Sequence, residues 1–387
     1  MGVVCGGQAG QFPGVMMGLP LVNHHDDSTI LSVALPMLTL VPGGMGGSET
    51  YARELTRQLV DVPGLEARAF VPSAAAGFSE GIPETIVGSV KGGSSTRERL
   101  ASLASATMHG RSLRASMSSA DVVHFPFTVP APRPSKRQAL VQTLLDVQHL
   151  DLPQLFSRAE LLYRRHFYEG VARRADGIIT ISEFAKQRMI DLLGIDGEKI
   201  QVAHLGVDIS RFVPNHGRRE NFVLYPARGW PHKNHARLIE AMRLVRRRIP
   251  DLRLVLTGGG LDTLGELPEW VDRRGLVGIA ELHDLYRSAS ALVFPSLYEG
   301  FGLPPLEAMA SGCPVAASAA GSIPEVCGDA AVLFDPLDPG AIADAIALAI
   351  DRGDELSAVG VSHAARFTWE NCRDAHVLAY RRAVTCH

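Results

Sequence analysis

Short apolar runs alternate along this chain with segments whose apolar residues recur at helical spacing. The first run, residues 28–40, is almost continuously apolar, which is typical of a strand covered on both faces of a parallel sheet. Helical patterns lie between several runs, notably at residues 49–60 and 158–175. The later runs of the first half are residues 66–71, 121–125, 139–144 and 177–181. This alternation predicts an α/β fold with a parallel sheet.

A second series of the same kind begins at residue 221. Its apolar runs are residues 222–226, 252–257, 292–294, 314–317 and 331–334. Its helical patterns are residues 234–248, 304–311 and 338–351. We therefore predict two doubly wound, Rossmann-like domains. In that arrangement ligands bind at the carboxyl ends of the strands, in a cleft between the domains.

The segment between the two series sets the predicted domain boundary. Residues 204–220 are rich in turn-forming and charged residues, so we expect an N-terminal domain at residues 28–215 and a second domain that begins at residue 216. Residues 1–27 show no clear periodicity and are predicted to form a loose N-terminal extension.

Composition and charge agree with an ordinary two-domain globular protein. The length of 387 residues exceeds what one hydrophobic core usually supports. Lys and Arg number 38 against 41 Asp and Glu, so the whole chain offers no electrostatic attraction for nucleic acid. The 5 cysteines form no C-x-x-C pair and are too sparse for a disulfide scaffold or a zinc knuckle. Lys and Arg are missing from residues 1–52, which argues against a secretory signal, and we predict a cytoplasmic protein.

The segment Glu299-Gly-Phe-Gly-Leu-Pro-Pro-Leu-Glu307 is the strongest candidate for chemistry. Its two glycines let the backbone approach a ligand, and its two prolines suit the first turn of a helix. Free N–H groups at a helix start attract phosphate, and the two carboxylates accept hydrogen bonds from sugar hydroxyls. The segment therefore predicts a site for a phosphorylated polyol. A plain glycine turn ahead of a helix is the alternative interpretation.

A second motif, Tyr225-Pro-Ala-Arg228-Gly-Trp-Pro-His-Lys233, also follows a strand-like run. Arg228 offers a planar fork to phosphate oxygens and Lys233 a mobile point charge, so the pair can neutralise a diphosphate leaving group. Negative charge grows on the phosphate oxygens when a glycosyl–phosphate bond breaks, and preorganised cations stabilise that transition state. Two solvated surface cations are the alternative interpretation.

A glycine loop, residues 43–49, stands between the first strand and its helix. Gly46 and Gly47 would let this loop approach a phosphate or a sugar across the cleft, and Ser48 is expected to cap the helix. The alternative is an ordinary turn, because glycine loops after strands are common and this one does not match G-x-G-x-x-G.

These three motifs occur in the order and context of the retaining glycosyltransferases of family 4, which the chain resembles over roughly residues 29–370. The Glu-x7-Glu pair at Glu299 and Glu307 is the best-known signature of that family. The other matching segments are residues 175–183, His204-Leu-Gly-Val-Asp208, Ser311-Gly-Cys-Pro-Val315, Ile323-Pro-Glu-Val326 and Phe334-Asp-Pro336. The resemblance implies the GT-B fold, with two Rossmann-like domains facing a central cleft. It also implies a donor domain at residues 216–366 and a final helix at residues 367–387 that crosses back to the N-terminal domain.

The resemblance implies side-chain roles at four matching positions. Arg228 and Lys233 would bind the donor diphosphate. Glu299 would bind the hydroxyls of the transferred sugar, and Glu307 the nucleoside ribose.

It implies backbone roles at five more positions. The amides of Phe301, Gly302 and Leu303 would hold the sugar and the phosphate. Gly46 and Gly47 would close the site from the N-terminal domain.

One departure from the family concerns residues 143–149, Thr-Leu-Leu-Asp-Val-Gln-His. Many relatives carry a His-Asp dyad here that touches the donor sugar, but Leu145 occupies the expected His position before Asp146. His149 lies nearby and is a candidate catalytic residue. A structural or an acceptor-binding role for its imidazole is the alternative.

The sequence predicts neither a metal nor a resident cofactor. It contains no Asp-x-Asp triplet, and its histidines lack a metal-ligand spacing. A nucleoside-diphosphate sugar would serve as co-substrate. The resemblance implies transfer with retention of the anomeric configuration, with the departing phosphate as the base that takes the acceptor proton.

The expected partners are a GDP- or UDP-sugar donor and a glycan or lipid-linked acceptor. The resemblance favours mannose as the hexose, in cell-envelope polysaccharide or glycolipid synthesis. A nucleotide-sugar-binding module without turnover is one alternative, and a GT-B phosphorylase or sugar-phosphate synthase is another. Residues 158–174 combine arginines with apolar side chains, which fits either peripheral contact with the inner face of the plasma membrane or an ordinary packed helix.

Overall fold

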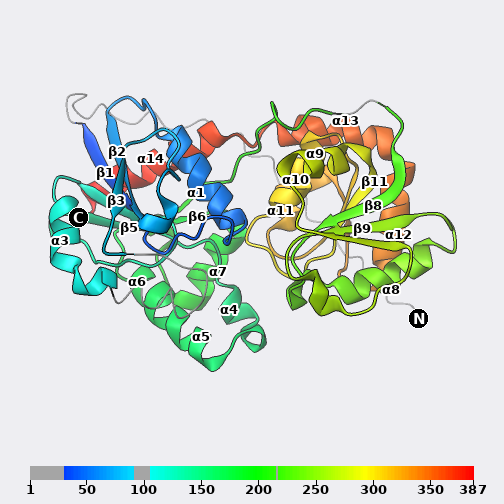
Figure 1. Ribbon diagram of the computed structural model, residues 1–387, viewed down its shortest axis with the longest axis horizontal. Coiled ribbons are helices and arrows are strands. Elements are labelled where there is room, and N and C mark those ends of the chain that lie inside the picture. The colour runs from blue at the N-terminus through cyan, green and yellow to red at the C-terminus, as the bar shows by residue number, and fades with distance from the viewer. Residues whose placement is uncertain (1–29, 91–104, 215–216) are drawn as a thin grey trace, which may run out of the picture.

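The computed structural model describes residues 30–90, 105–214 and 217–387. Within these residues the strands form two parallel sheets, one in each half of the chain (Figure 1). The predicted fold class, α/β with two doubly wound Rossmann-like domains, is confirmed. The predicted extension at residues 1–27 and the predicted boundary at residues 215 and 216 lie outside the described residues.

The first sheet has the strand order β3-β2-β1-β4-β5-β6-β7. Its strands are β1 (Leu31–Pro36), β2 (Leu65–Pro72), β3 (Glu84–Val87), β4 (Val122–Phe125), β5 (Ala139–Thr143), β6 (Gly177–Thr180) and β7 (Ile200–Val202). The helices of this half are α1 (Gly47–Gln58), α3 (Gly110–Ser116), α4 (Gln148–Asp151), α5 (Arg158–Arg164), α6 (Gly170–Ala172) and α7 (Glu183–Leu193). Successive strands are added on one side of β1 up to β3 and on the other side from β4 onwards, so the topological switch point lies between β1 and β4. The glycine loop follows β1 at this point, where open α/β sheets bind ligands.

The second sheet repeats this plan in the order β10-β9-β8-β11-β12-β13. Its strands are β8 (Glu220–Pro226), β9 (Arg253–Thr257), β10 (Val271–Gly275), β11 (Ala289–Phe294), β12 (Val315–Ser318) and β13 (Val332–Phe334). Its helices are α8 (His235–Val245), α9 (Ile279–Ser288), α10 (Leu303–Ala310), α11 (Ile323–Cys327), α12 (Pro339–Asp351) and α13 (Gly353–Ala364). The switch point falls between β8 and β11, the two strands that precede Arg228 and Glu299.

Helices cover the second sheet because their apolar stripes face it. In α8 the buried residues Leu238, Ala241, Met242 and Val245 follow the three- and four-residue spacing of one helix face. Strand β11 is buried along its last four residues, as expected of a parallel strand with both faces covered. The sheet is therefore a rigid base for the loops at its carboxyl end.

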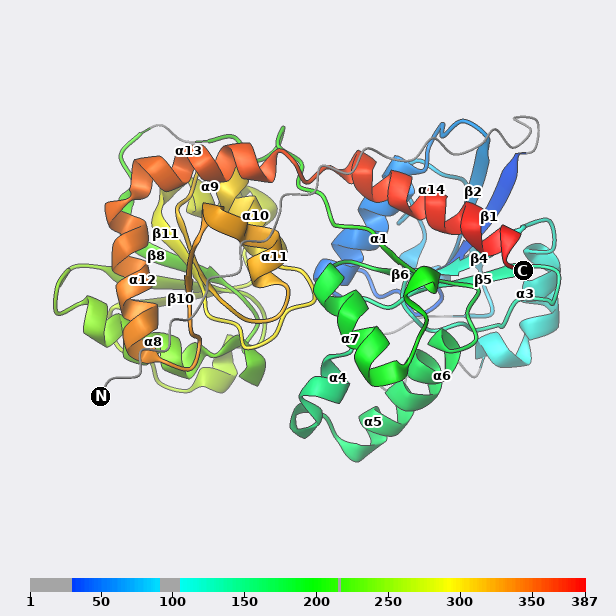
Figure 2. The ribbon, with the colours of Figure 1, turned by 180° about the vertical axis from the view of Figure 1, so that it is seen from behind.

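The last helix, α14 (Trp369–Thr385), lies with the N-terminal half (red in Figure 2). It contacts α1 and the strands β4, β5, β6 and β7. The chain crosses between the two halves twice, first after β7 near Val207 and again at residues 365–368, just before α14. The two crossing segments lie side by side, and the Val207 amide donates to the Phe367 carbonyl at 3.0 Å. Gly206 permits this approach, because a Cβ there would lie 2.3 Å from the backbone nitrogen of Trp369.

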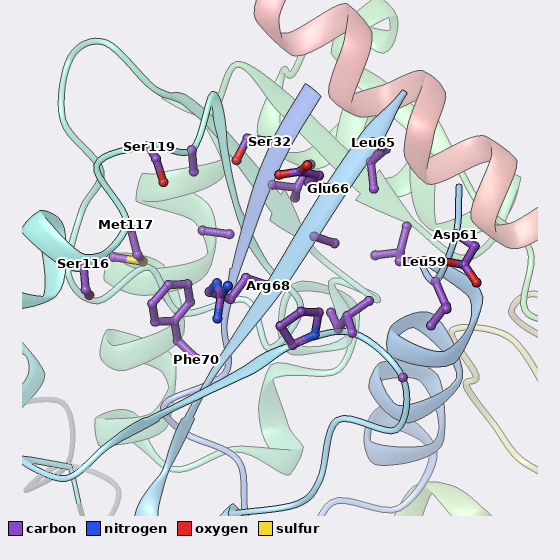
Figure 3. A pocket seen from close by; sticks show the side chains of 18 residues that line it. Ser32, Leu59, Asp61, Leu65, Glu66, Arg68, Phe70, Ser116, Met117 and Ser119 are labelled. Atoms are coloured by element: carbon purple, nitrogen blue, oxygen red, sulfur yellow. The ribbon is translucent and has the colours of Figure 1, made fainter. Parts of the chain in front are cut away.

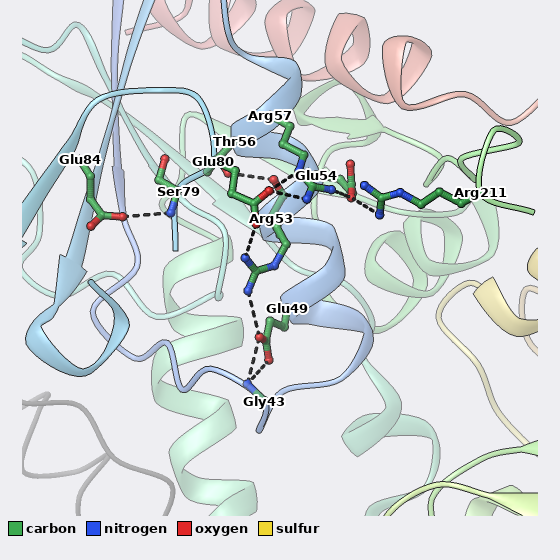
Figure 4. A network of polar contacts seen from close by, with 10 residues as sticks. All are labelled: Gly43, Glu49, Arg53, Glu54, Thr56, Arg57, Ser79, Glu80, Glu84 and Arg211. Atoms are coloured by element: carbon green, nitrogen blue, oxygen red, sulfur yellow. Dashed lines mark hydrogen bonds and ion pairs between the residues drawn. The ribbon is translucent and has the colours of Figure 1, made fainter. Parts of the chain in front are cut away.

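Charged side chains hold the glycine loop and α1 in place (Figure 4). The Glu49 carboxylate accepts two contacts from the Gly43 amide, at 2.8 and 3.0 Å. Arg53 of the same helix donates to Glu80 at 2.8 Å. Gly46 occupies the cap position of α1 without a side-chain hydrogen bond, so the expected capping by Ser48 is wrong.

The continuous helix predicted over residues 158–175 is interrupted. A capping box of Ser157 and Glu160 starts α5, as serine and glutamate three residues apart favour. After Arg164 the chain forms the π turn η3 (Arg165–Glu169) before α6. In α5 and η3 the side chains are partly buried or exposed, so this segment covers the domain without entering its core.

Candidate functional site

Lys233 and Glu299 meet as a close ion pair beyond the carboxyl end of the second sheet. Lys233 ends the 3₁₀ turn η5 (Pro231–Lys233) after β8, and Glu299 follows β11. The Lys233 Nζ donates to Glu299 Oε1 at 2.6 Å, and each side chain is 14% exposed. The two residues come from different motifs, and the structure brings them together as one mostly buried ion pair.

The loops that carry this pair are tied to each other. Asn234 has the left-handed φ of 62°, and its buried amide donates to the carbonyls of Pro295 at 3.0 Å and Pro336 at 2.7 Å. The Tyr225 hydroxyl donates to the Lys233 carbonyl at 2.7 Å. The backbone around Lys233 is therefore fixed relative to the loop after β11.

The Glu299 loop is held by its neighbour, residues 321–322. The Ser322 Oγ lies 3.0 Å from the Glu299 carbonyl oxygen and 2.7 Å from that of Phe301. Gly302 has φ 121°, a conformation that favours glycine, and directly precedes α10. The predicted amides of Phe301, Gly302 and Leu303 therefore lie at the start of a helix, where N–H groups can meet an anion.

Glu307 lies on α10 and is oriented by a residue that the sequence did not indicate. The Tyr286 hydroxyl of α9 donates to Glu307 Oε2 at 2.8 Å. Burial raises the pKa of the Glu307 carboxyl, and the bond from Tyr286 opposes that rise. No local pattern pointed to Tyr286, because the contact joins two helices whose relative position comes from the fold.

Arg228 faces the glycine loop of the other half. Its guanidinium lies 5.4 Å from the ring centroid of Trp230. A Cβ added to Gly46 would lie 3.9 Å from Arg228 Nε, whereas one added to Gly47 would meet nothing within 4 Å. The predicted glycine loop and the predicted phosphate-binding cation are thus side by side, and at residue 46 the positive φ also favours glycine.

Asp146 contacts the Glu299 loop from the N-terminal half. A Cβ added to Gly300 would lie 3.3 Å from Asp146 Oδ2 and 3.2 Å from the Leu145 carbonyl oxygen. The Ser182 hydroxyl donates to the Gly300 carbonyl at 2.8 Å. Burial and the negative charge of Glu299 raise the pKa of the Asp146 carboxyl, although nearby donors and cations oppose the shift. The sequence indicated Asp146 as part of a His-Asp motif whose His is replaced by Leu145, but it did not indicate this contact with the Glu299 loop.

His149 lies on α4, in the N-terminal half, and its imidazole interacts electrostatically with Asp146. Its side chain is 1% exposed, with Nε2 3.4 Å from Glu169 Oε1. Its ring makes edge contacts with Phe156 and Tyr168. Burial lowers the pKa of the imidazole, which favours the neutral form at physiological pH. Its contacts are thus with its own half, and its catalytic role stays a prediction.

A cavity of about 370 Å³ lies away from these residues, at the amino ends of β1 and β2 (Figure 3). Its lining includes Ser32, Leu65, Glu66 and Arg68 but none of the predicted site residues. Among the described residues, no helix is long and apolar enough to cross a membrane, and no three His, Cys, Asp or Glu side chains form a metal-binding group. The predicted site residues therefore lie outside this cavity.

Comparison with known sequences finds two family matches that cover most of the chain. Residues 45–211 match Glycosyltransferase Family 4, and residues 207–360 match Glycosyl transferases group 1. O-antigen chain mannosyltransferase B of Escherichia coli is 31% identical over 273 residues, which are 64% of this chain and 71% of that protein. MMP alpha-(1->4)-mannosyltransferase of Mycolicibacterium hassiacum is 31% identical over 236 residues, 55% of this chain and 56% of that protein.

Solved structures show the same fold at lower identity. Sucrose-phosphate synthase from Thermosynechococcus elongatus superposes with a TM-score of 0.74 at 20% identity, covering 92% of this chain and 100% of that one. Anabaena HepE in complex with UDP and glucose gives 0.67 at 18% identity, with 90% and 98% covered. The sequence matches and the shared GT-B fold lead to one conclusion: the chain belongs to the family 4, group 1 glycosyltransferases, which transfer a sugar from a nucleotide-sugar donor.

Proposed function

We propose that this glycosyltransferase moves a hexose, with mannose the first to test, from a GDP- or UDP-sugar to an acceptor hydroxyl. Transfer retains the anomeric configuration and needs no metal ion. The observation that carries this proposal is the 2.6 Å pair of Lys233 and Glu299. It sets a cation for the leaving diphosphate beside a carboxylate for the sugar hydroxyls, at the switch point where such folds bind ligands.

Each residue has a defined role in this proposal. Arg228 and Lys233 stabilise the charge that grows on the leaving phosphate. Glu299 accepts hydrogen bonds from the transferred sugar and Glu307 from the ribose. The departing phosphate takes the acceptor proton, as in the family.

His149 remains a separate candidate for a direct role. Complete loss of turnover in a folded His149→Ala variant would support it. Turnover equal to that of the unmodified enzyme would remove His149 from the catalytic residues.

Mannose is favoured because two similar proteins carry the name mannosyltransferase. The acceptor in this proposal is a glycan or a lipid-linked sugar. A nucleotide-sugar-binding module without turnover is the first alternative, and it would bind nucleotide but release no sugar. A phosphorylase or sugar-phosphate synthase is the second, and it would require phosphate or a phosphorylated acceptor.

The test is a donor screen with GDP-mannose, UDP-glucose, UDP-galactose and GDP-glucose, following release of the free nucleoside diphosphate. Glu299→Ala is the negative control. One donor should give clear turnover, and turnover should persist after removal of metal with a chelator. Proton NMR of the product should show the donor's anomeric configuration. An inverted product, or activity restored only by Mg²⁺ or Mn²⁺, would refute the corresponding part of the proposal.

We also propose the division into an N-terminal acceptor domain at 28–215, a donor domain at 216–366 and a returning segment at 367–387. The contacts of α14 with β4 to β7 support the return. We place the enzyme in the cytoplasm, with peripheral contact at the inner face of the plasma membrane through residues 158–174. Flotation with liposomes tests the contact, and a protein that stays in the lower fraction would contradict it.

A further inference from the structure

Arg164, the last residue of α5, contacts two aromatic rings. Its guanidinium carbon lies 4.5 Å from the ring centroid of Phe156 and 5.0 Å from that of Tyr168. Such contacts act on the face of a guanidinium and leave its N–H edge available. Within the described residues, Arg164 makes no side-chain hydrogen bond and no ion pair. Its fork of donors is thus fixed in position and has no partner there.

Other arginines near the surface of this half bind carboxylates through their guanidinium N–H groups. Arg188 binds Asp151 through both Nε and Nη2. Arg173 pairs with Glu169 at 3.9 Å. Arg164 is only partly exposed and, in the part of the chain that the structure describes, has no such carboxylate, so its donors are suited to a group outside the chain.

The charge of Arg164 acts on the interface that holds the transferred sugar in the proposed function. Burial raises the pKa of the Asp146 carboxyl, and the charge of Arg164 opposes that rise. Burial lowers the pKa of the His149 imidazole, and the charge of Arg164 lowers it further. Arg164 therefore lies close to both residues. Asp146 in turn touches Gly300, directly after Glu299. Burial favours the uncharged form of Asp146, which weakens the compensation that this carboxyl gives to Arg164. Another carboxylate that interacts with Arg164 is Glu160, one turn earlier on α5, whose hydrogen bonds are made with Ser157.

We propose that Arg164 binds an anionic group of the acceptor, so that the glycan or lipid-linked sugar of the proposed function carries a phosphate or a carboxylate close to the hydroxyl that accepts the hexose. This inference rests on the proposed function, in which the N-terminal half holds the acceptor. Bidentate contact between a guanidinium and two oxygens fixes both distance and plane. With the guanidinium held by Phe156 and Tyr168, an acceptor bound through its anionic group would present a hydroxyl towards the Glu299 loop.

The binding test uses glycerol 3-phosphate as the probe. The donor site is first saturated with a nucleoside diphosphate, so that the probe cannot occupy the place of Arg228 and Lys233. Isothermal titration should then show saturable binding that weakens by roughly tenfold or more in Arg164→Gln, since a charged hydrogen-bonding partner is lost. Arg164→Lys, which keeps the charge but loses the planar fork, should bind with intermediate affinity.

Arg165→Gln is the matched control. Arg165 is the next residue and is exposed, and among the described side chains it stacks on no ring. Its removal should therefore leave both probe affinity and donor hydrolysis unchanged. Equal probe affinity in the unmodified enzyme and Arg164→Gln would overturn the proposal. An equal loss in Arg165→Gln would also overturn it, because the effect would belong to the basic face as a whole.

Two further measurements distinguish acceptor binding from lipid binding and from a failure of the donor site. Flotation with phosphatidylglycerol vesicles detects a lipid surface: weaker flotation of Arg164→Gln with unchanged glycerol 3-phosphate affinity would assign Arg164 to lipid and overturn the proposal. If no nucleoside diphosphate binds, the proposed function fails. The same titration in a Lys233→Ala background, without nucleotide, then still decides whether Arg164 binds the probe. Circular dichroism checks that each variant folds.

Discussion

At the scale of single residues, the candidate site is ordered before a ligand arrives. Lys233 is held by Glu299, and Arg228 lies over Trp230 beside Gly46. Preorganised charges of this kind stabilise a transition state without the cost of reorienting during the reaction. The consequences can be measured at each position separately.

Lys233→Ala should strongly lower the catalytic efficiency of sugar transfer. Removing one partner of a desolvated charge pair typically costs ~2–5 kcal/mol, and ~1.4 kcal/mol corresponds to a factor of ten. We therefore expect kcat/KM for the donor to fall roughly thirty-fold to several thousand-fold. Lys199→Ala is the control, since Lys199 is exposed and lies just before β7 in the N-terminal half. This variant should have the catalytic efficiency of the unmodified enzyme. A change of less than about threefold in Lys233→Ala would exclude Lys233 from the donor site.

Gly46→Ala and Gly47→Ala form a matched pair in the same loop. Gly46 has φ 59°, and its added Cβ would approach Arg228, whereas Gly47 has open space and begins α1. A left-handed position costs of order 1–3 kcal/mol for a residue with a side chain. Gly46→Ala should therefore lower the unfolding midpoint and raise KM for the donor, while Gly47→Ala should do neither to the same degree. Chemical denaturation and donor kinetics measure the two effects, and identical behaviour of the variants would contradict this account.

The sequence indicated the charged residues of the site better than the residues that orient them. Arg228, Lys233 and Glu299 stand in motifs after strand-like runs, where their chemistry could be read directly. Tyr286 has no such local pattern, because it acts through a contact made only when separate helices come together. Asp146 stood in the motif of residues 143–149, but its contact with the Glu299 loop joins the two halves of the chain and could not be read from that motif. The roles of all these residues in catalysis stay predictions.

At the scale of elements, α14 is joined to the N-terminal sheet by a chain of buried hydrogen bonds. Its members are Tyr51, His124, Thr143, His376 and Tyr380. Burial lowers the pKa of His376 to about 4, so its imidazole is neutral at pH 7. Its Nδ1 donates to the Cys372 carbonyl one turn earlier in α14, and Nε2 therefore accepts from the Tyr51 hydroxyl. The Tyr51 oxygen then accepts from the Thr143 hydroxyl. The Thr143 oxygen accepts from His124 Nε2, and His124 Nδ1 accepts from the Tyr380 hydroxyl. This order requires both imidazoles to be neutral.

The neutral histidines predict a fall in stability in mild acid. Burial lowers the pKa of His376 from 6.5 to about 4, and that of His124 also falls well below its ordinary value. As pH falls below 6.5, these histidines bind protons in the unfolded chain before they do so in the folded protein. Their contribution to the free energy of unfolding is therefore complete above pH 6.5 and is lost as pH falls towards 4.

The measurement is the free energy of unfolding between about pH 7.5 and 5. Carboxyl groups with ordinary pKa values near about 4 contribute little in this window. Burial raises the pKa values of the Asp146 and Glu307 carboxyls, so these two groups oppose the fall. The imidazoles of His232 and His235, whose pKa values also fall to about 4, add to it. The free energy should be nearly constant above about pH 7 and fall steadily below about pH 6.5. A constant value down to the lower limit would show that these imidazoles are not held neutral in the folded protein.

Element types were easier to predict than element boundaries. The apolar strands β8 and β11 stood out as continuous runs, but β10 reads Val-Asp-Arg-Arg-Gly and has no such signal. It forms a strand because its backbone pairs with β9 at the edge of the sheet, and its own hydrophobic pattern does not indicate this. The helix predicted over residues 158–175 contains the π turn, which its smooth periodicity did not reveal.

At the scale of the whole molecule, one carboxylate from the C-terminal half binds two elements of the other. Glu325 of α11 accepts from the amides of Glu183 and Phe184, at 2.8 and 2.9 Å, where α7 begins. It also pairs with His204 Nε2 at 2.6 Å. Although burial opposes them, these donors lower the pKa of the Glu325 carboxyl, so it stays charged at neutral pH. The contact therefore favours the arrangement in which Asp146 meets the Glu299 loop.

Glu325→Ala should shift the two halves towards a more open arrangement. Hydrogen bonds to a charged group contribute about 1.5–3 kcal/mol each, and losing them would change the balance between closed and open forms by roughly tenfold or more. Small-angle X-ray scattering should show a larger radius of gyration, and KM for the donor should rise because both halves contribute to its site. Glu355→Ala is the control, since Glu355 is exposed and pairs with Arg352 within the same half. If scattering and KM of Glu325→Ala match those of the unmodified enzyme, the two halves are held together by the crossing segments at Val207 and Phe367, and Glu325 serves only the start of α7.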